Sequence, residues 1–197
     1  MKLGRARDEA VGSGRRARAR GVSHGAALVR VRVPDAQQGP VDWPLIERAL
    51  DTPLPGDYVD LVHRYHGLVI DDWLGVRMPR PGSERYYVEG ILSCLDALDR
   101  ARRDGRAGGH IPYPGPGGLL PWGGSLDGAT FYWRTSPAGP ERWTVVVQAA
   151  GGEWDEVPRN LTGCLAGLVL GDIRPQGLPP YFPAPDPSVS VDPAWRP

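Results

Sequence analysis

The chain has 197 residues, of which 41% are hydrophobic and seven are tryptophan, and this composition indicates a folded protein of one domain with tails. The sequence contains no run of the about 18 apolar residues that a membrane span needs. It also lacks the apolar segment of a secretory signal near its first residue. These features exclude a transmembrane helix and favour a cytoplasmic protein.

The formal net charge is zero, but the charges are unevenly distributed along the chain. Residues 1–33 carry nine basic and two acidic side chains, whereas the rest of the chain carries 14 basic and 21 acidic ones. A basic arm of +7 therefore precedes an acidic remainder of −7. The stretch GSGRRARARG is typical of a solvated, disordered tail, although the same charge could bind nucleic acid or an anionic membrane surface.

The predicted organisation has three parts: a basic disordered arm (residues 1–37), an α+β domain (residues 38–174) and a proline-rich tail (residues 175–197). The tail contains eight prolines and no amphipathic stripe. We expect it to be a tail or a loose strap. Three of its aromatic side chains are candidates for docking onto the domain: Tyr181, Phe182 and Trp195.

Apolar side chains recur with the 3.6-residue period of an amphipathic helix in four places. The predicted helices cover about residues 42–50, 57–67, 84–103 and 160–171. Asp42 and Asn160 are the expected N-caps of the first and last helices. Gly67 and Gly171 are expected to end the second and the last.

Runs of β-favouring residues predict strands at about residues 73–78, 118–122, 130–134, 142–150 and 153–157. The last two are joined at Gly151-Gly152, a two-residue loop that suits a tight hairpin. Early helices, a later meander of strands and a closing helix indicate an α+β fold, with about four helices on one face of a mostly antiparallel sheet. The expected core includes Trp122, Tyr132, Trp133 and Trp143, and Cys94 and Cys164 are expected to be buried free thiols.

The stretch LLPWGGSLDGATFYW has two glycines, Gly123 and Gly128, spaced as in a phosphate-binding loop. Ala129 stands where such a loop needs the lysine that contacts the phosphates, and the chain's only lysine is Lys2. The residues between Ser125 and Gly128 are typical of a turn. The stretch therefore predicts a hairpin and not a nucleotide site.

Three stretches, in this order, resemble the SUKH superfamily, which includes the fungal cell-wall-assembly regulator domain and many bacterial immunity proteins. They are LPGDYVDLVHRYHGLVI, then LLPWGGSLDGATFYWRT, then RWTVVV, and a leucine-rich helix follows them. The resemblance covers about Trp43 to Ile173, and it departs from the family at YHGLVI, where related sequences often have Asn-Gly-Gly. It implies an α+β domain without catalysis. Bacterial members commonly neutralise nuclease or deaminase toxins, and fungal relatives act as scaffolds.

Catalytic chemistry has only dispersed candidates. His63 and His66 lie three residues apart, with Asp71 and Asp72 shortly beyond, and two histidines with a carboxylate could hold a metal. No sequence motif indicates a further metal ligand. Ser125 and Asp127 could form a nucleophile pair, but the Gly-x-Ser-x-Gly motif is absent. We therefore expect no enzyme activity, metal or cofactor, with a small metal-dependent hydrolase using His63 and His66 as the less favoured alternative.

Two short stretches combine acidic and aromatic residues, as a surface that binds a basic partner would. They are IDDWLG and EWDE. The predicted partner-binding residues are Asp71, Asp72, Trp73, Asp127, Glu153, Trp154, Asp155 and Glu156. The alternative is that the tryptophans pack in the core and the acids face water. The expected partner is the basic cleft of a toxin domain, and a scaffold role through the basic arm or proline-rich tail remains open.

Overall fold

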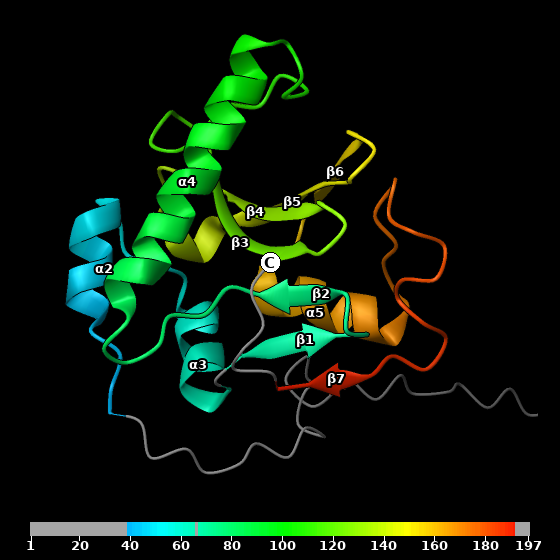
Figure 1. The fold of residues 1–197 in the computed structure, drawn as a ribbon, viewed down its shortest axis with the longest axis horizontal. Helices are drawn as coiled ribbons and strands as arrows, with labels where there is room; N and C mark the ends of the chain where they lie inside the picture. The colour runs from blue at the N-terminus through cyan, green and yellow to red at the C-terminus, as the bar shows by residue number, and fades with distance from the viewer. Residues whose placement is uncertain (1–38, 66, 192–197) are drawn as a thin grey trace, which may run out of the picture.

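The computed structural model of the chain describes residues 39–65 and 67–191 (Figure 1). The basic arm predicted over residues 1–37, His66 and Trp195 lie outside these residues. Within the described part, one seven-stranded antiparallel sheet is accompanied by four α-helices, which confirms the predicted α+β class. The sheet has the strand order β6-β5-β4-β3-β2-β1-β7.

The four helices are close to their predicted ranges: α2 (Trp43–Leu50), α3 (Gly56–Arg64), α4 (Glu84–Arg103) and α5 (Leu161–Leu170). Both predicted N-caps are confirmed, because the side chain of Asp42 accepts a hydrogen bond from the Leu45 N–H and that of Asn160 from the Gly163 N–H. Gly171 ends α5 with a φ of 73°, in the left-handed region that glycine adopts without strain.

The second helix, α3, ends earlier than predicted. Gly67 was the expected end, but Tyr65 already has extended backbone, with φ −132° and ψ 136°. The Tyr65 side chain is buried in the core beyond the end of the helix.

The strands are β1 (Leu68–Ile70), β2 (Leu74–Val76), β3 (Leu119–Ser125), β4 (Thr130–Arg134), β5 (Thr144–Gln148), β6 (Trp154–Val157) and β7 (Val189–Ser190). The β3–β4 hairpin is confirmed, whereas β1 and β7 were not predicted, because runs of three and two residues show no periodicity. Trp73 lies in the turn before β2 and not in a strand. The prediction of a two-residue loop at Gly151-Gly152 is wrong. The register pairs Gln148 with Trp154, and Gly152 has a φ of 95° within a longer turn.

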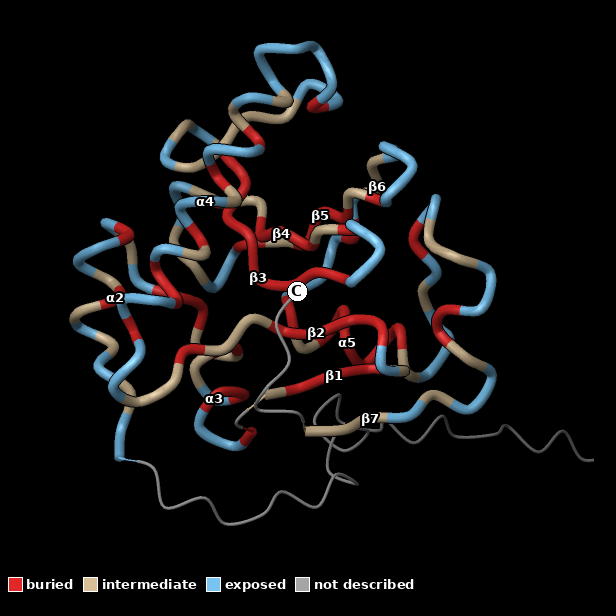
Figure 2. The backbone as a smooth tube through the Cα atoms, viewed as in Figure 1, coloured by how far each residue is buried: buried red, intermediate tan, exposed pale blue. Residues whose placement is uncertain are grey.

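The sheet separates two apolar clusters, because alternate side chains of each strand point to opposite faces. Phe131 and Trp133 of β4 join the larger cluster with residues of α2, α3, α4 and α5, whereas Tyr132 joins a smaller one with Leu98 of α4. All four predicted core aromatics are buried. Figure 2 shows the buried residues concentrated in the central strands and α5. Cys164 is buried, but Cys94 is only half-buried.

The C-terminal strap, defined here as residues 175–191, lies along one side of the domain and ends in β7 beside β1 (Figure 1). Phe182 is 1% exposed and belongs to the larger cluster, so its predicted docking is confirmed. Tyr181 is 63% exposed and does not dock. The proline-rich segment, as far as residue 191, is therefore packed onto the domain.

Trp122→Ala should lower the free energy of unfolding by about 3–5 kcal/mol, because the indole is fully buried against Phe131 and Trp133 and its removal leaves a cavity. Chemical denaturation followed by tryptophan fluorescence measures this loss. Leu126→Ala, at a side chain 73% exposed in the β3–β4 turn, is the control and should change stability little. Equal stability of the Trp122 variant and the wild type would contradict the predicted packing.

Candidate binding surface

The turn between β1 and β2 carries the first predicted acidic stretch. Asp71 and Asp72 both have left-handed backbone, with φ values of 53° and 50°, and the Trp73 N–H donates to the Ile70 carbonyl at 3.0 Å. Aspartate tolerates this conformation better than most residues that carry a side chain. Asp72 is exposed, whereas Asp71 is half-buried against the strap.

Trp73 is not the exposed anchor that the sequence predicted. It is 8% exposed, and its ring centroid lies 4.2 Å from that of Phe182 and 6.4 Å from that of Phe131. Its indole N–H donates to an Asp127 carboxylate oxygen at 3.0 Å. Burial of the large apolar ring against the strap outweighs its exposure to a partner.

Asp127 and Ser125 close the β3–β4 turn. The Ser125 hydroxyl donates to the Asp127 carboxylate, and the Ser125 Oγ accepts from the Ala129 N–H at 3.0 Å. Burial raises the pKa of Asp127, but the hydrogen bonds from Ser125 and Trp73 outweigh it and hold that pKa below its ordinary value. Ser125 and Asp127 thus stabilise the turn, as the turn-like composition of this stretch predicted.

The second predicted stretch lies on β6 and in the turn before it. Trp154 is half-buried, with its ring stacked on Tyr132 at 5.9 Å and tilted against His110 at 4.5 Å. Glu156 forms an ion pair with Arg134. Glu153 is exposed, and Asp155 is half-buried.

The strap brings the two stretches into one surface. Asp155 Oδ2 accepts from the Gln176 N–H at 2.9 Å near the start of the strap. Asp71 accepts from the N–H groups of Ala184 and Ser188, at 2.9 and 2.7 Å, near its end. Two of the acidic residues predicted to bind a partner therefore bind the chain's own C-terminal segment.

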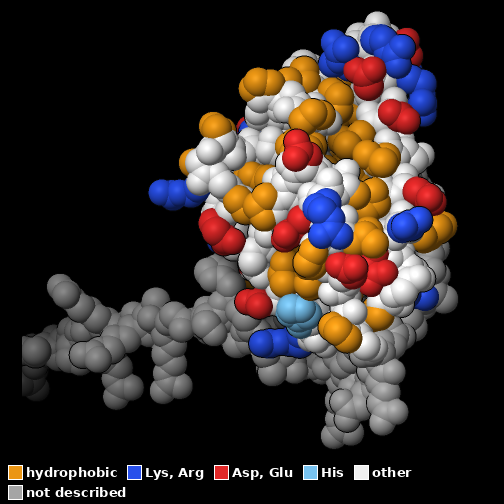
Figure 3. Space-filling view, turned by 90° about the vertical axis from the view of Figure 1, so that its left-hand side faces the viewer, with side chains coloured by type: hydrophobic (Ala, Val, Ile, Leu, Met, Phe, Trp, Pro, Cys, Tyr) orange, Lys and Arg blue, Asp and Glu red, His pale blue; other side chains and the backbone are white. Residues whose placement is uncertain are grey.

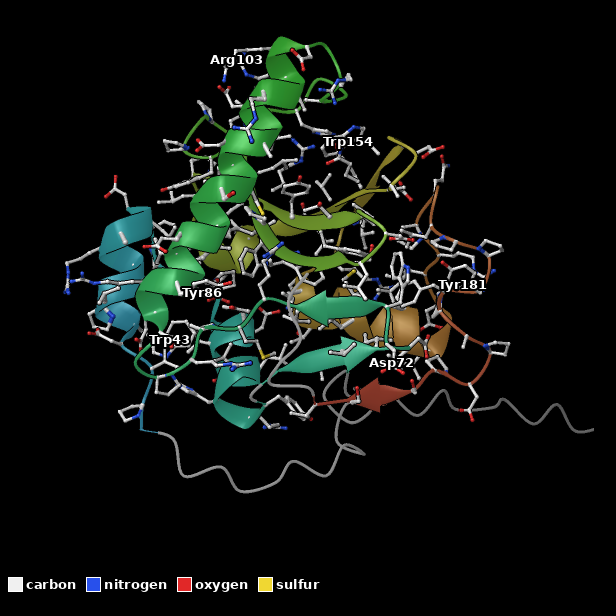
Figure 4. The ribbon with its side chains drawn as sticks, viewed as in Figure 1. Trp43, Asp72, Tyr86, Arg103, Trp154 and Tyr181 are labelled. Atoms are coloured by element: carbon white, nitrogen blue, oxygen red, sulfur yellow. The ribbon has the colours of Figure 1, made fainter. Side chains whose placement is uncertain are left out.

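Five exposed acidic side chains lie in these turns, in the strap or shortly before it. We call them the acidic rim: Asp72, Asp127, Glu153, Asp172 and Asp186. Figure 4 places Asp72 and Tyr181 on the strap side of the molecule, with Trp43 and Tyr86 on the other side. That other side, over α2 and α4, shows acidic, basic and apolar side chains interspersed (Figure 3). The strap thus lies beside both predicted acidic stretches, whereas Glu156 is paired with Arg134 of β4.

The residues considered for a metal site are not brought together in the described part of the chain. His63 Nε2 accepts from the Trp43 indole N–H at 3.2 Å, and the two rings pack edge to face. Asp71 is engaged by the strap, and His66 is not described. Over residues 39–65 and 67–191, no three His, Cys, Asp or Glu side chains group as metal ligands.

One polar cluster had no signal in the sequence. His110 Nδ1 lies 3.1 Å from Arg134 Nη2, and Arg134 also pairs with Glu156. Burial lowers the pKa of His110, the positive charge of Arg134 lowers it further, and Glu156 opposes them only in part. Because Arg134 can only donate, His110 accepts this hydrogen bond in its neutral form. No local motif links these residues, which come from a loop and two strands.

Comparisons with known proteins give no match: no family model, no curated protein and no solved structure matches the chain. The chain's similarity to the SUKH superfamily therefore stays a prediction. Among the helices of the described residues, none has the length and apolar character that crossing a membrane requires.

Stability should decrease as the pH falls below about 6.5, the ordinary pKa of histidine. Because the folded-state pKa of His110 is depressed, the unfolded chain binds the proton more readily, and stability is lost as the pH falls through the folded pKa. Urea denaturation between about pH 7.5 and about pH 5.5 measures this slope. His110→Gln cannot titrate and should show a shallower slope. The same slope in both proteins would exclude His110 as its source.

Proposed function

We propose that this chain is a non-catalytic protein-binding domain that neutralises a nuclease- or deaminase-type toxin by covering its basic cleft, as an immunity protein does. The observation that carries the proposal is the acidic rim, which gathers acids from separate chain segments on the strap side. The described residues carry 19 acidic and 13 basic side chains, so their net charge is −6. The resemblance to SUKH immunity proteins points to the same role.

Electrostatic complementarity explains why such a surface would suit this partner. A toxin that acts on nucleic acid must hold phosphates, so its cleft carries positive charge. An acidic surface attracts that cleft over a distance of about 8–10 Å at physiological salt and can raise the association rate by roughly 10–10³. The nucleic acid that such a toxin attacks is inside the cell, so we propose that the chain acts in the cytoplasm.

The internal contacts of the candidate catalytic residues also favour binding over catalysis. Ser125 and Asp127 stabilise a turn, Asp71 holds the strap, and His63 accepts from Trp43. A scaffold that recruits partners through a free proline-rich tail is less favoured, because the segment up to residue 191 is docked on the domain.

The double variant Asp72→Arg and Glu153→Arg should slow association with the toxin about tenfold or more, because it reverses two charges of the acidic rim. The toxin to test is any nuclease or deaminase domain that a neighbouring gene encodes, and the measurement is stopped-flow association at several salt concentrations. The double variant should also protect cells that express the toxin less well than the wild type does.

Glu89→Arg makes the same kind of charge reversal at an exposed position of α4, a helix that lies apart from the strap in Figure 1, and should leave association unchanged. Association that does not depend on salt would contradict the electrostatic mechanism. Purification of the chain with a stoichiometric metal ion, or turnover of a substrate by the chain alone, would contradict the non-catalytic role.

A further inference from the structure

The strand β1 would be a sheet edge if the chain did not cover it with its own C-terminal strap. Its three residues, Leu68–Ile70, are buried, and β7 pairs with it antiparallel, Val69 opposite Ser190 and Ile70 opposite Val189. A strand edge without a partner offers unpaired N–H and C=O groups that can pair with another chain. The strap therefore occupies a position that an added strand could take.

Most contacts that hold the strap involve backbone groups. Asp71 Oδ2 accepts from the Ala184 N–H and Oδ1 from the Ser188 N–H, and the Asp71 N–H donates to the Ser188 carbonyl at 2.9 Å. Prolines stand at positions 183, 185 and 187, so Ala184 lies between two residues that have no N–H, and Ser188 directly follows a third. This pattern suits an extended, proline-rich segment.

One side chain supplies the anchor. Phe182 is almost fully buried, and its ring lies against that of Trp73. The neighbouring Tyr181 is exposed, so the surface distinguishes between two adjacent aromatic residues by position. The contacts therefore define a simple pattern: an aromatic residue followed by proline, backbone donors two and six residues further on, and then a short strand.

Few residues of the strap are buried. Of residues 175–191, only Pro175, Phe182 and Pro183 are buried. The strand β7 is the last in the sheet and pairs with β1 alone. Segments with few buried contacts at a sheet edge open at a lower free-energy cost than the core does.

We propose that β1, Asp71 and Trp73 form a peptide-binding groove and that the strap is its built-in occupant. The partner that fits is an extended, proline-rich segment of another protein, with an aromatic anchor for Trp73 and a strand that pairs antiparallel with β1. Binding of this segment displaces the strap. The proposal goes beyond the toxin-neutralising role. The groove recognises backbone groups and one aromatic side chain, whereas the toxin-neutralising role depends on the acidic rim.

A labelled synthetic peptide of residues 178–191, LPPYFPAPDPSVSV, tests the groove by fluorescence anisotropy with the full-length protein. Phe182→Ala in the protein weakens its own strap and leaves the groove intact, so this variant should bind the peptide at least about tenfold more tightly than the wild type does. Tyr181→Ala removes an exposed ring and should behave as the wild type. The peptide with alanine in place of its phenylalanine should not bind.

A folded Phe182→Ala protein that binds neither peptide, or both equally, would overturn the proposal. Hydrogen exchange of the wild-type chain gives a readout that does not depend on the variant folding. The amides of Asp71 and Ser188, which join turn and strap, should exchange at least about tenfold faster than the β3–β4 amides. Equal protection would mean that the strap does not open. If the wild-type protein were a dimer that the peptide dissociates, the groove would bind a second copy of this chain. That result would overturn the proposal of a different protein as partner.

Discussion

The packing of Trp73 against Phe182 joins three parts of the molecule that are far apart in the sequence. The Trp73 ring contacts the strap through Phe182 and the sheet through Phe131, and its N–H reaches the β3–β4 turn at Asp127. A buried indole loses its hydration, so the hydrogen bond to Asp127 offsets part of the cost of burying it. The position of the strap, and with it the shape of the acidic surface, follows from this contact.

The acidic residues of this surface have two different tasks. Asp71 and Asp155 accept hydrogen bonds from backbone N–H groups of the strap, so they contribute to folding. Exposed acids such as Asp72 and Glu153 lie beside them and contribute charge. The same segments therefore build the surface and give it its sign. A charge reversal at Asp71 would disturb both, whereas one at Asp72 leaves the carboxylates of Asp71 and Asp155 in place to hold the strap.

The features that could be predicted from the sequence are those that depend on local spacing. The caps at Asp42 and Asn160 and the hairpin around Ser125–Gly128 follow from residues within a few positions of one another. The features that could not be predicted depend on distant partners. The donors to Asp71 are backbone groups 113 and 117 residues further along the chain. Every residue except proline has a backbone N–H, so residue type does not indicate such a donor.

The candidate site shows the same division. Clustering of acids with tryptophans marked two stretches for the candidate surface, and the strap contacts both stretches. The burial of Trp73 was missed because it requires Phe182, in a segment whose prolines predicted a loose tail. The His110–Arg134 contact was missed because a loop histidine next to glycines has no periodic neighbours.

The left-handed backbone of Asp71 restricts which residues evolution can place at this position. Glycine adopts the conformation but has no acceptor, and asparagine would turn an amide NH₂ toward one of the two donors. Only aspartate combines the backbone geometry with two accepting oxygens. The strap itself must keep an aromatic residue at position 182, glycine at position 177, where φ is 75°, and backbone donors at positions 176, 184 and 188. Most of its other positions can vary. Distant relatives of this chain should therefore be easier to detect by the paired aspartates and tryptophan of the β1–β2 turn than by alignment of their C-terminal segments.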